Sequence, residues 1–480
     1  MENILNWNIP IEKYFEQVAR IPRESGHEEA ISQYLLDFAE ERGLWSYRDD
    51  SLNVIIRKPA SAGYEDAAPL MLEAHTDMVC AKTPDCVHDF RKDPIEFYVK
   101  DGIMRAKGTS LGADDGWGVA YMLAILEDDT LKHPMLECVF TTCEETNMGG
   151  AKALDVSKLR ARRMIGLDGD VDTESFVSCF TSDRLVFRKK VAQTGCSGNA
   201  VRIAIGDMST NVYGGINHPE CGNSIKIVAR LLKNLVDDGV PVRIAGITGG
   251  RAENIVPETG EVILNIGEYD ATQLEKKVRA YHTQLNDEFE KEDFHGRMTV
   301  ENTSAQAAMT EEDSKNLTEF LYLLPNNMLQ AGIESHSLNC INNIGMLRYV
   351  NGEVTITGSG RSRYISAGDD LLTRCRTLAE LFGYEFETEK RYQGWPYNKT
   401  SQIRTLVNEA MREQYGCELK EVICPGGLEI AILVEAIEGM DAIELGVNHD
   451  NPHSTEESME MVSFHKMYQV VTAVLEKCVK

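Results

Sequence analysis

Three short apolar runs, at residues 70–72, 136–140 and 164–167, constrain most strongly how this chain can fold. Each run is bounded by polar or glycine residues, a pattern typical of buried strands. Between the first two runs, residues 116–127 place apolar side chains at helical spacing, which predicts a helix docked on a sheet. If the three strands are parallel in one sheet, their carboxyl ends share one edge, and open α/β sheets place their ligands at that edge.

Acidic and histidine side chains occur where each apolar run stops. The segments that carry them are HTD, ADDG, CEET and LDGD. Their acidic and histidine residues at this edge are His75, Asp77, Asp114, Asp115, Glu144, Glu145 and Asp168. Imidazole nitrogen and carboxylate oxygen suit zinc or a neighbouring divalent ion. So many carboxylates would repel one another and raise their pKa values unless cations neutralised them. A pair of divalent cations at this edge would remove that conflict.

Composition narrows the functional class. With 480 residues the chain exceeds one typical domain, so two are expected. The net charge of −27 argues against nucleic acid or an anionic membrane as a partner. No apolar run has the length of a membrane span, and MENILNWNIPIEKYF has neither the basic start nor the apolar core of a signal peptide. The 12 cysteines form no C-x-x-C pair and are expected to be reduced thiols, so we expect a cytoplasmic protein.

The pattern of elements changes after about residue 180. From there to about residue 390, predicted strands and helices alternate in two rounds, which indicates an inserted α+β domain of two similar lobes. The chain then returns to helical and strand patterns like those of its first part. We therefore predict a discontinuous first domain, residues 1–181 and 391–480, and an inserted domain at 182–390.

Taken together, HTDMV, GADDG, CEET and LDGD resemble the metal-site motifs of the M20 metallopeptidases. The later segment NHDNPHS is similar to the aminoacyl-histidine dipeptidase branch of that family. The resemblance implies a zinc-exopeptidase-like α/β domain, with a central mixed sheet flanked by helices, and a lid domain at 182–390. It also implies metal-dependent hydrolysis of dipeptides, and it makes a homodimer possible because this branch forms dimers.

The resemblance implies two divalent metal ions per chain. Zinc is the expected metal, although manganese or cobalt would accept the same ligands. His453 is preferred over His449 as the last ligand because it stands in the P-H-S context of the family. By resemblance, Asp114 bridges the two ions, one of which is bound by His75 and Asp168 and the other by Glu145 and His453.

Two further acidic residues receive catalytic roles by resemblance. Asp77 is expected to fix the tautomer of the His75 imidazole. Glu144 is the expected general base, which takes a proton from the attacking water and passes it to the leaving amine. Because neighbouring strand residues point to opposite sides, the backbone must turn for both Glu144 and Glu145 to serve the site. The glycine-rich residues 146–150 are expected to provide that turn.

Substrate recognition is expected from the inserted domain. Arg361 matches the family's lid arginine and would bind a substrate carboxylate through two hydrogen bonds, and Asn254 matches a lid asparagine near the substrate. The chain also departs from the family. STNVYGGINH has Val212 or Tyr213 where a lid histidine is expected, and only the later His218 follows.

A second departure occurs at CPGGLEIAI, where Pro425 occupies a position at which the family has histidine. Because residues that polarise the substrate carbonyl and shape the pocket differ, two alternatives stay open beside the dipeptidase. One is a related amidohydrolase acting on N-acyl amino acids or other small amides. The other is a catalytically impaired metal- or peptide-binding homologue, against which the presence of Glu144 argues. In the first hypothesis the partner is a small peptide substrate.

Overall fold

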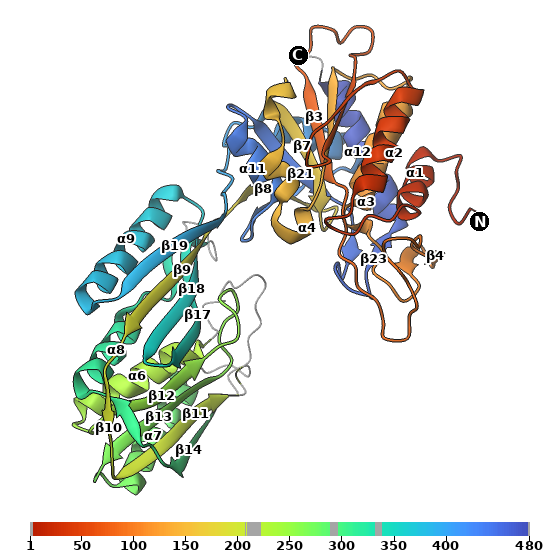
Figure 1. Cartoon of the computed structure of the whole chain (residues 1–480). Coiled ribbons are helices and arrows are strands. Elements are labelled where there is room, and N and C mark those ends of the chain that lie inside the picture. The colour runs from red at the N-terminus through yellow and green to blue at the C-terminus, as the bar shows by residue number, and fades with distance from the viewer. Residues whose placement is uncertain (1–2, 207, 209–221, 289–295, 332–337, 479–480) are drawn as a thin grey trace. The chain divides into compact units, whose positions relative to one another are not determined.

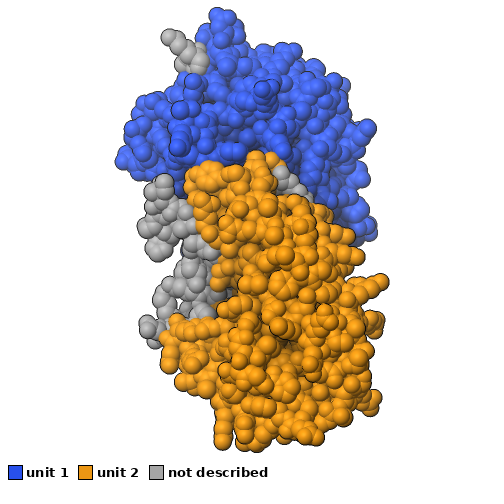
Figure 2. Space-filling view, turned by 90° about the vertical axis from the view of Figure 1, so that its left-hand side faces the viewer, with its two compact units in different colours: residues 1–179, 395–424, 428–480 blue, residues 180–394, 425–427 orange. Residues whose placement is uncertain are grey.

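The computed structural model describes residues 3–206, 208, 222–288, 296–331 and 338–478. The chain divides into two compact units (Figure 2). The first contains residues 1–179, 395–424 and 428–480, and the second contains residues 180–394 and 425–427. Each unit has its own hydrophobic core.

A mixed eight-stranded sheet forms the centre of the first unit (Figure 1). Four neighbouring strands in it, β6, β3, β7 and β21, are parallel, so their carboxyl ends lie at one edge. The predictions of strands at 70–72, 136–140 and 164–167 and of their parallel arrangement are therefore confirmed. The strands, in sheet order, are β1 (Trp45–Arg48), β2 (Val54–Lys58), β6 (Leu136–Thr141), β3 (Leu70–His75), β7 (Arg163–Gly169), β21 (Asp441–Gly446), β8 (Glu174–Cys179) and β20 (Lys420–Cys424).

The sheet is buried on both faces because its strands alternate apolar side chains between two cores. In β3, Leu70, Leu72 and Ala74 enter the larger core, while Met71 enters a smaller one on the opposite face. Helices α1, α2, α3, α10 and α12 contribute to the larger core, and α5 and α11 contribute to the smaller one. The helices are α1 (Pro10–Ala19), α2 (Glu29–Glu41), α3 (Ala113–Glu127), α4 (Glu144–Asn147), α5 (Gly149–Ala153), α10 (Gln402–Tyr415), α11 (Glu429–Ala436) and α12 (Met461–Lys477), with a short 3₁₀ turn at Val156–Lys158.

A small four-stranded sheet completes the first unit. Its order is β22 (His449–Asp450), β23 (Ser458–Glu460), β5 (Ile103–Ala106) and β4 (Phe97–Lys100). β22 and β23 pair antiparallel, so residues 451–457 form the loop between them. β23 pairs in turn with β5. This pairing fixes the base of the loop that carries His453.

The second unit contains a nine-stranded antiparallel sheet. Its strands, in order, are β14 (Arg297–Thr303), β11 (Asn199–Gly206), β13 (Gly260–Gly267), β12 (Arg243–Gly249), β17 (Leu338–Val350), β18 (Glu353–Ser362), β9 (Thr181–Lys190) and β19 (Glu385–Tyr392), with β16 (Asn327–Ala331) beside β17. A two-stranded ribbon joins β10 (Gln193–Gly195) to β15 (Ala307–Met309). The helices are α6 (Ser224–Asp237), α7 (Ala271–Glu288), α8 (Glu311–Leu323) and α9 (Ile365–Phe382).

The second unit is built from two halves with the same topology. One half runs β11, α6, β12, β13, α7, β14, and the other runs β9, α8, β17, β18, α9, β19. In each half, the sheet order is fourth, first, third and second strand, and the halves join where β12 pairs with β17. The first half is inserted in the sequence between β9 and α8 of the other. The predicted pair of similar lobes is therefore confirmed as a repeated topology.

Candidate metal centre

The side chains predicted to bind metal come from consecutive parallel strands of the first unit. His75 is the last residue of β3, Asp168 is the last but one of β7, and Glu145 lies four residues beyond β6. His453 belongs to the loop between β22 and β23, which follows β21. Because these strands are parallel, the four residues approach the same edge of the sheet, and Asp114 reaches it from the start of α3.

Two groups of potential ligand atoms share Asp114. His75, Asp114 and Asp168 form one group, and Asp114, Glu145 and His453 form the other, with ligand atoms within 4.8 Å of one another in each group. The two oxygens of Asp114 face different histidines. Its Oδ1 lies 2.8 Å from His75 Nε2, and its Oδ2 lies 3.1 Å from His453 Nε2. A carboxylate in this arrangement can bridge two ions.

The remaining distances define the outer members of each group. His75 Nε2 lies 3.6 Å from Asp168 Oδ1, and His453 Nε2 lies 2.9 Å from Glu145 Oε2. The five residues predicted as ligands are therefore all brought together. His449, the alternative histidine, lies 3.3 Å from Asp170 and belongs to neither ligand group found among the described residues.

A turn at Cys143 brings Glu144 and Glu145 to this edge. Cys143 has φ of +53°, a left-handed conformation, and the backbone then enters the single helical turn of α4. Asp77 accepts hydrogen bonds from the backbone N–H groups of Glu144 at 3.0 Å and of Glu145 at 3.2 Å. Glu28 accepts one from Cys143 N–H at 3.0 Å. The turn thus precedes the two glutamates, and the expectation that residues 146–150 provide it was wrong.

The contact expected between Asp77 and the His75 imidazole is long. Asp77 Oδ1 lies 3.5 Å from His75 Nδ1, beyond the usual range of a hydrogen bond. His75 Nδ1 therefore makes no hydrogen bond among the described residues. The Asp77 carboxylate instead binds the backbone of the Cys143 turn. Asp77 thus links the end of β3 to the segment that carries Glu144.

Asp115 holds both α3 and the end of β3. Its Oδ1 accepts a hydrogen bond from Gly118 N–H at 3.1 Å, and its Oδ2 accepts one from His75 N–H at 3.2 Å. Asp114 and Asp115 themselves have non-helical dihedral angles, so the regular helix begins at Gly116, as the predicted range 116–127 required. The sequence assigned no role to Asp115 or Glu28, although an acidic residue just before a helix is a typical cap.

Burial and mutual charge perturb the acidic residues strongly. Burial and the charge of Asp114 raise the pKa of Asp168 well above its usual value. Burial, together with the charges of Glu429 and Glu145, raises the pKa of Glu144 to about 8, against the opposing effect of His75. Burial also raises the pKa of Asp114, but hydrogen bonds with His453 and His75 outweigh it and hold that pKa well below the usual range.

The two histidines respond to the same carboxylates. Burial lowers the pKa of His75, but Asp168, Asp114 and Asp77 outweigh it and raise that pKa well above its ordinary value. Hydrogen bonds with Asp114 and Glu145 raise the pKa of His453 to about 10. The carboxylates of the cluster thus favour positive charge beside them. A site of hard oxygens and imidazole nitrogens with this preference fits divalent cations.

Comparison with known proteins identifies the family. The sequence model of peptidase family M20/M25/M40 matches residues 71–477, which is most of the chain and includes all the residues of both ligand groups. The chain belongs to this family. It is therefore a hydrolase that acts on peptide bonds.

Individual relatives of this M20 peptidase match over nearly its full length. A cytosol non-specific dipeptidase of Escherichia coli is 28% identical over 479 residues, covering 98% of this chain and 97% of the relative. The crystal structure of an aminoacylhistidine dipeptidase from Vibrio alginolyticus is 26% identical with a TM-score of 0.94, covering 99% and 98% of the two chains. A tripeptidase structure from Staphylococcus aureus, 19% identical with a TM-score of 0.57 and covering 99% of each chain, shares the fold.

The residues that the sequence linked to substrate lie in the second unit of the peptidase. Arg361, on β18, is buried and donates a hydrogen bond from Nη1 to the carbonyl oxygen of Pro425 at 2.9 Å. Asn254 is exposed in a turn that precedes β13. Val212, Tyr213 and His218 lie outside the described residues. Pro425 therefore contacts Arg361 through its backbone.

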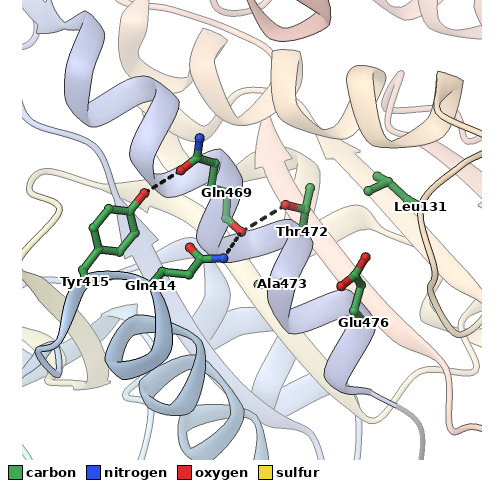
Figure 3. Close-up of a pocket in the computed structure, with 7 residues that line it drawn as sticks. All are labelled: Leu131, Gln414, Tyr415, Gln469, Thr472, Ala473 and Glu476. Carbon is green, nitrogen blue, oxygen red and sulfur yellow. Dashed lines mark hydrogen bonds between the residues drawn. The ribbon is translucent and has the colours of Figure 1, made fainter.

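A separate hollow of about 440 Å³ lies in the first unit of the peptidase between the end of α10 and α12 (Figure 3). Tyr415 donates a hydrogen bond to the Gln469 side chain at 2.8 Å, and Gln414 donates one to the Gln469 carbonyl oxygen at 3.3 Å. Its lining includes the single carboxylate of Glu476 and neither imidazole nor thiol, so it offers no set of metal ligands.

No described helix is long and apolar enough to cross a bilayer.

Proposed function

We propose that this M20 peptidase is a dizinc dipeptidase that acts on short peptides. The observation that carries the proposal is the geometry of Asp114, whose two oxygens face His75 and His453 separately. The names of the Escherichia coli and Vibrio alginolyticus relatives, both dipeptidases, support the substrate class.

In this proposal His75 and Asp168 would hold one zinc ion, Glu145 and His453 would hold the other, and Asp114 would be shared by both. When bound, zinc acts as a Lewis acid that polarises a substrate carbonyl and makes water a stronger nucleophile. Manganese and cobalt fit the same ligands and would replace zinc without a change of residues. The five side chains leave room for substrate because each group holds only three protein ligands.

Glu144 is the proposed general base. Its carboxylate takes a proton from the attacking water and passes it to the amine that leaves. Asp77 fixes the position of Glu144 and Glu145 by accepting their backbone hydrogen bonds at 3.0 and 3.2 Å. The proposed roles of Glu144 as general base and of Glu145 as metal ligand both depend on the Cys143 turn, so this turn positions the two residues together.

We propose that residues 182–390 act as a lid that supplies substrate contacts, with residues 1–181 and 391–480 as the catalytic domain. Arg361 would bind the carboxylate of the peptide through the two-pronged geometry of its guanidinium, and Asn254 would bind near it. This assignment rests on the match of both positions to family motifs. A cytoplasmic location and a homodimer complete the proposal, and sedimentation of the purified chain tests the dimer.

The experiment that tests this function is hydrolysis of a dipeptide panel by the zinc-loaded protein beside Glu144→Gln. The variant keeps the shape of the side chain but cannot accept the proton, so we expect kcat to fall by about 10²- to 10⁴-fold. Metal content, measured on the same samples, should stay equal. Glu96→Gln, which changes an exposed carboxylate of the same unit, is the matched control and should leave kcat unchanged.

A parent protein that binds two metal ions yet cleaves no dipeptide would overturn the proposed substrate. N-acetylated amino acids and N-acetylated dipeptides belong in the same panel. A dipeptidase requires the free amino group, whereas an amidohydrolase of N-acyl amino acids accepts the blocked one. Cleavage of only blocked substrates would assign the chain to the second class.

A further inference from the structure

The Glu457 carboxylate binds four consecutive backbone N–H groups beside the metal centre. Its Oε2 accepts hydrogen bonds from Leu111 at 2.7 Å and Gly112 at 3.0 Å, and its Oε1 accepts them from Ala113 at 2.8 Å and Asp114 at 3.3 Å. The side chain is only 2% exposed. Every one of these donors belongs to the segment that leads into Asp114, so one carboxylate fixes the path of that segment.

Glu457 belongs to the same loop as His453. Both lie between β22 and β23, at the base of which His449 pairs with Met459. The carboxylate therefore ties the loop of His453 to the segment of Asp114. These two segments are more than 300 residues apart in the sequence, yet they supply ligand atoms only 3.1 Å apart. No other side chain of the described loop 451–457 binds the backbone of residues 111–114.

Arg23 holds the same segment from its other side. Its Nη2 donates to the Gly112 carbonyl oxygen, and its Nη1 donates to the carbonyl oxygens of Thr76 at 3.1 Å and Asp77 at 2.8 Å. Arg23 is 2% exposed, and burial lowers its pKa against the opposing charge of Glu457. The backbone of Gly112 is thus held by Glu457 at its N–H group and by Arg23 at its carbonyl oxygen.

Gly112 is required for this arrangement. Its φ is +68°, and a Cβ atom added there would lie 2.5 Å from Arg23 Nη2. The hydrogen bonds therefore continue from the His453 loop through Glu457, the 111–114 segment and Arg23 to Asp77. Asp77 in turn holds the backbone of Glu144 and Glu145.

We propose that Glu457 is a positioning residue that sets the distance between Asp114 and His453 and thereby determines the affinity of the second metal site. The inference rests on the proposed function, since it concerns the ion held by Asp114, Glu145 and His453. The hydrogen bonds that the structure describes for Glu457 all go to backbone N–H groups and none to either candidate ligand side chain. It acts through the backbone, so its removal should weaken one site more than the other.

Glu457→Gln is the sharpest test because it keeps the side-chain shape. Each carboxylate oxygen accepts two N–H groups, so whichever way the amide is oriented, its NH₂ group faces two backbone donors. The neighbouring Glu456 is exposed, and its replacement by Gln removes the same charge from the same loop. Glu456→Gln is therefore the matched control.

The measurement is zinc binding by competition with a chromogenic chelator, which resolves two equivalents per chain. We expect Glu457→Gln to bind one equivalent about 10- to 100-fold more weakly, in the range found when residues that orient metal ligands are removed. The other equivalent should change less, and Glu456→Gln should match the parent. Equal affinities in Glu457→Gln and the parent would overturn the proposal.

A double-mutant cycle with His453→Ala separates positioning from general destabilisation. If Glu457 acts through the placement of His453, Glu457→Gln should change zinc affinity little in the His453→Ala background. A full, additive loss in that background would show a merely structural role. Should Glu457→Gln fail to fold, Glu457→Asp retains the charge, and the same cycle applies. A parent that binds no zinc would instead overturn the proposed function. That outcome differs from equal zinc affinities in the parent and Glu457→Gln, which would overturn only the role of Glu457.

Discussion

Gly150 shows how closely the backbone packs around the turn that carries the two glutamates. Its N–H donates to the Thr142 carbonyl oxygen at 2.8 Å, and its carbonyl accepts from Asn53 Nδ2 at 2.9 Å. A Cβ atom at this position would lie 2.3 Å from the Thr142 carbonyl oxygen and 2.4 Å from its nitrogen. Since both are backbone atoms, only a shift of the whole turn could accommodate a side chain.

We expect Gly150→Ala to destabilise the first unit by about 1–3 kcal/mol through overpacking. The displaced turn carries Glu144 and Glu145, so dipeptide hydrolysis should fall as well. Urea unfolding and kcat measure the two effects. Gly206→Ala is the control, because a Cβ atom there meets nothing within 4 Å and should change stability by less than about 0.5 kcal/mol. Equal stability of Gly150→Ala and the parent would contradict the prediction.

The candidate ligands His75, Asp114, Glu145 and Asp168 could be found in the sequence because each follows a recognisable apolar strand or precedes a helix, whereas His453 was chosen by its resemblance to the family's P-H-S segment. The roles of Glu28 and Glu457 near the site could not be found, because they bind backbone N–H groups more than 100 residues away in the chain. A backbone donor leaves no trace in residue identity. Asp115 is intermediate: its cap of α3 follows a local rule, whereas its contact with His75 N–H does not.

At the scale of elements, Glu127 joins three helices. It ends α3 and accepts hydrogen bonds from Lys13 of α1 at 3.0 Å and from Arg42, the residue after α2, at 2.8 Å. Arg42 also donates to the hydroxyl of Tyr14 at 3.0 Å. Burial raises the pKa of Glu127, but the hydrogen bonds from Tyr14, Arg42 and Lys13 outweigh it and lower that pKa to about 2.

Because this pKa lies below its ordinary value of 4.5, the ionised Glu127 stabilises the folded state above pH 4.5. That contribution is lost as the pH falls from 4.5 toward about 2. We therefore expect Glu127→Gln to lower Tm at pH 7 and the difference from the parent to narrow by pH 3. Thermal unfolding across this range measures it, with Glu40→Gln, exposed on α2, as the control. A constant Tm difference at all pH values would contradict the prediction.

The central strands of the first unit followed from their apolar pattern, whereas the turn that carries the two glutamates did not. Residues 70–72, 136–140 and 164–167 have the short apolar pattern of parallel strands, so β3, β6 and β7 were predictable. The turn at Cys143 was not, since a left-handed φ at a non-glycine residue has no sequence signature there. The extra hydrogen bonds from Asp77 and Glu28 stabilise that conformation, and they depend on the folded sheet.

At the scale of the molecule, the two units have separate cores, and both ligand groups belong to the first. Zinc should therefore stabilise the first unit alone. We expect calorimetry of the metal-free chain to show two transitions, one of which rises in temperature with zinc while the other stays. An excess of 100 times the dissociation constant adds about 2.7 kcal/mol to the first unit.

Asp114→Asn removes the residue common to both ligand groups and should abolish the zinc-dependent shift without moving the second transition. Equal shifts of both transitions in the parent would contradict independent unfolding of the two units. A shift that persists unchanged in Asp114→Asn would place the stabilising zinc elsewhere.

The return of the chain to the first unit has a consequence for its translation. β7 has β21 as its neighbour on one side, yet β21 begins only at Asp441, so residues 170–440 are synthesised before that edge can be paired. An unpaired apolar strand edge is prone to aggregation until its neighbouring strand is present. His453 is also synthesised last among the five ligands. The pair of candidate ligand groups is therefore incomplete until the segment that contains His453 has been synthesised.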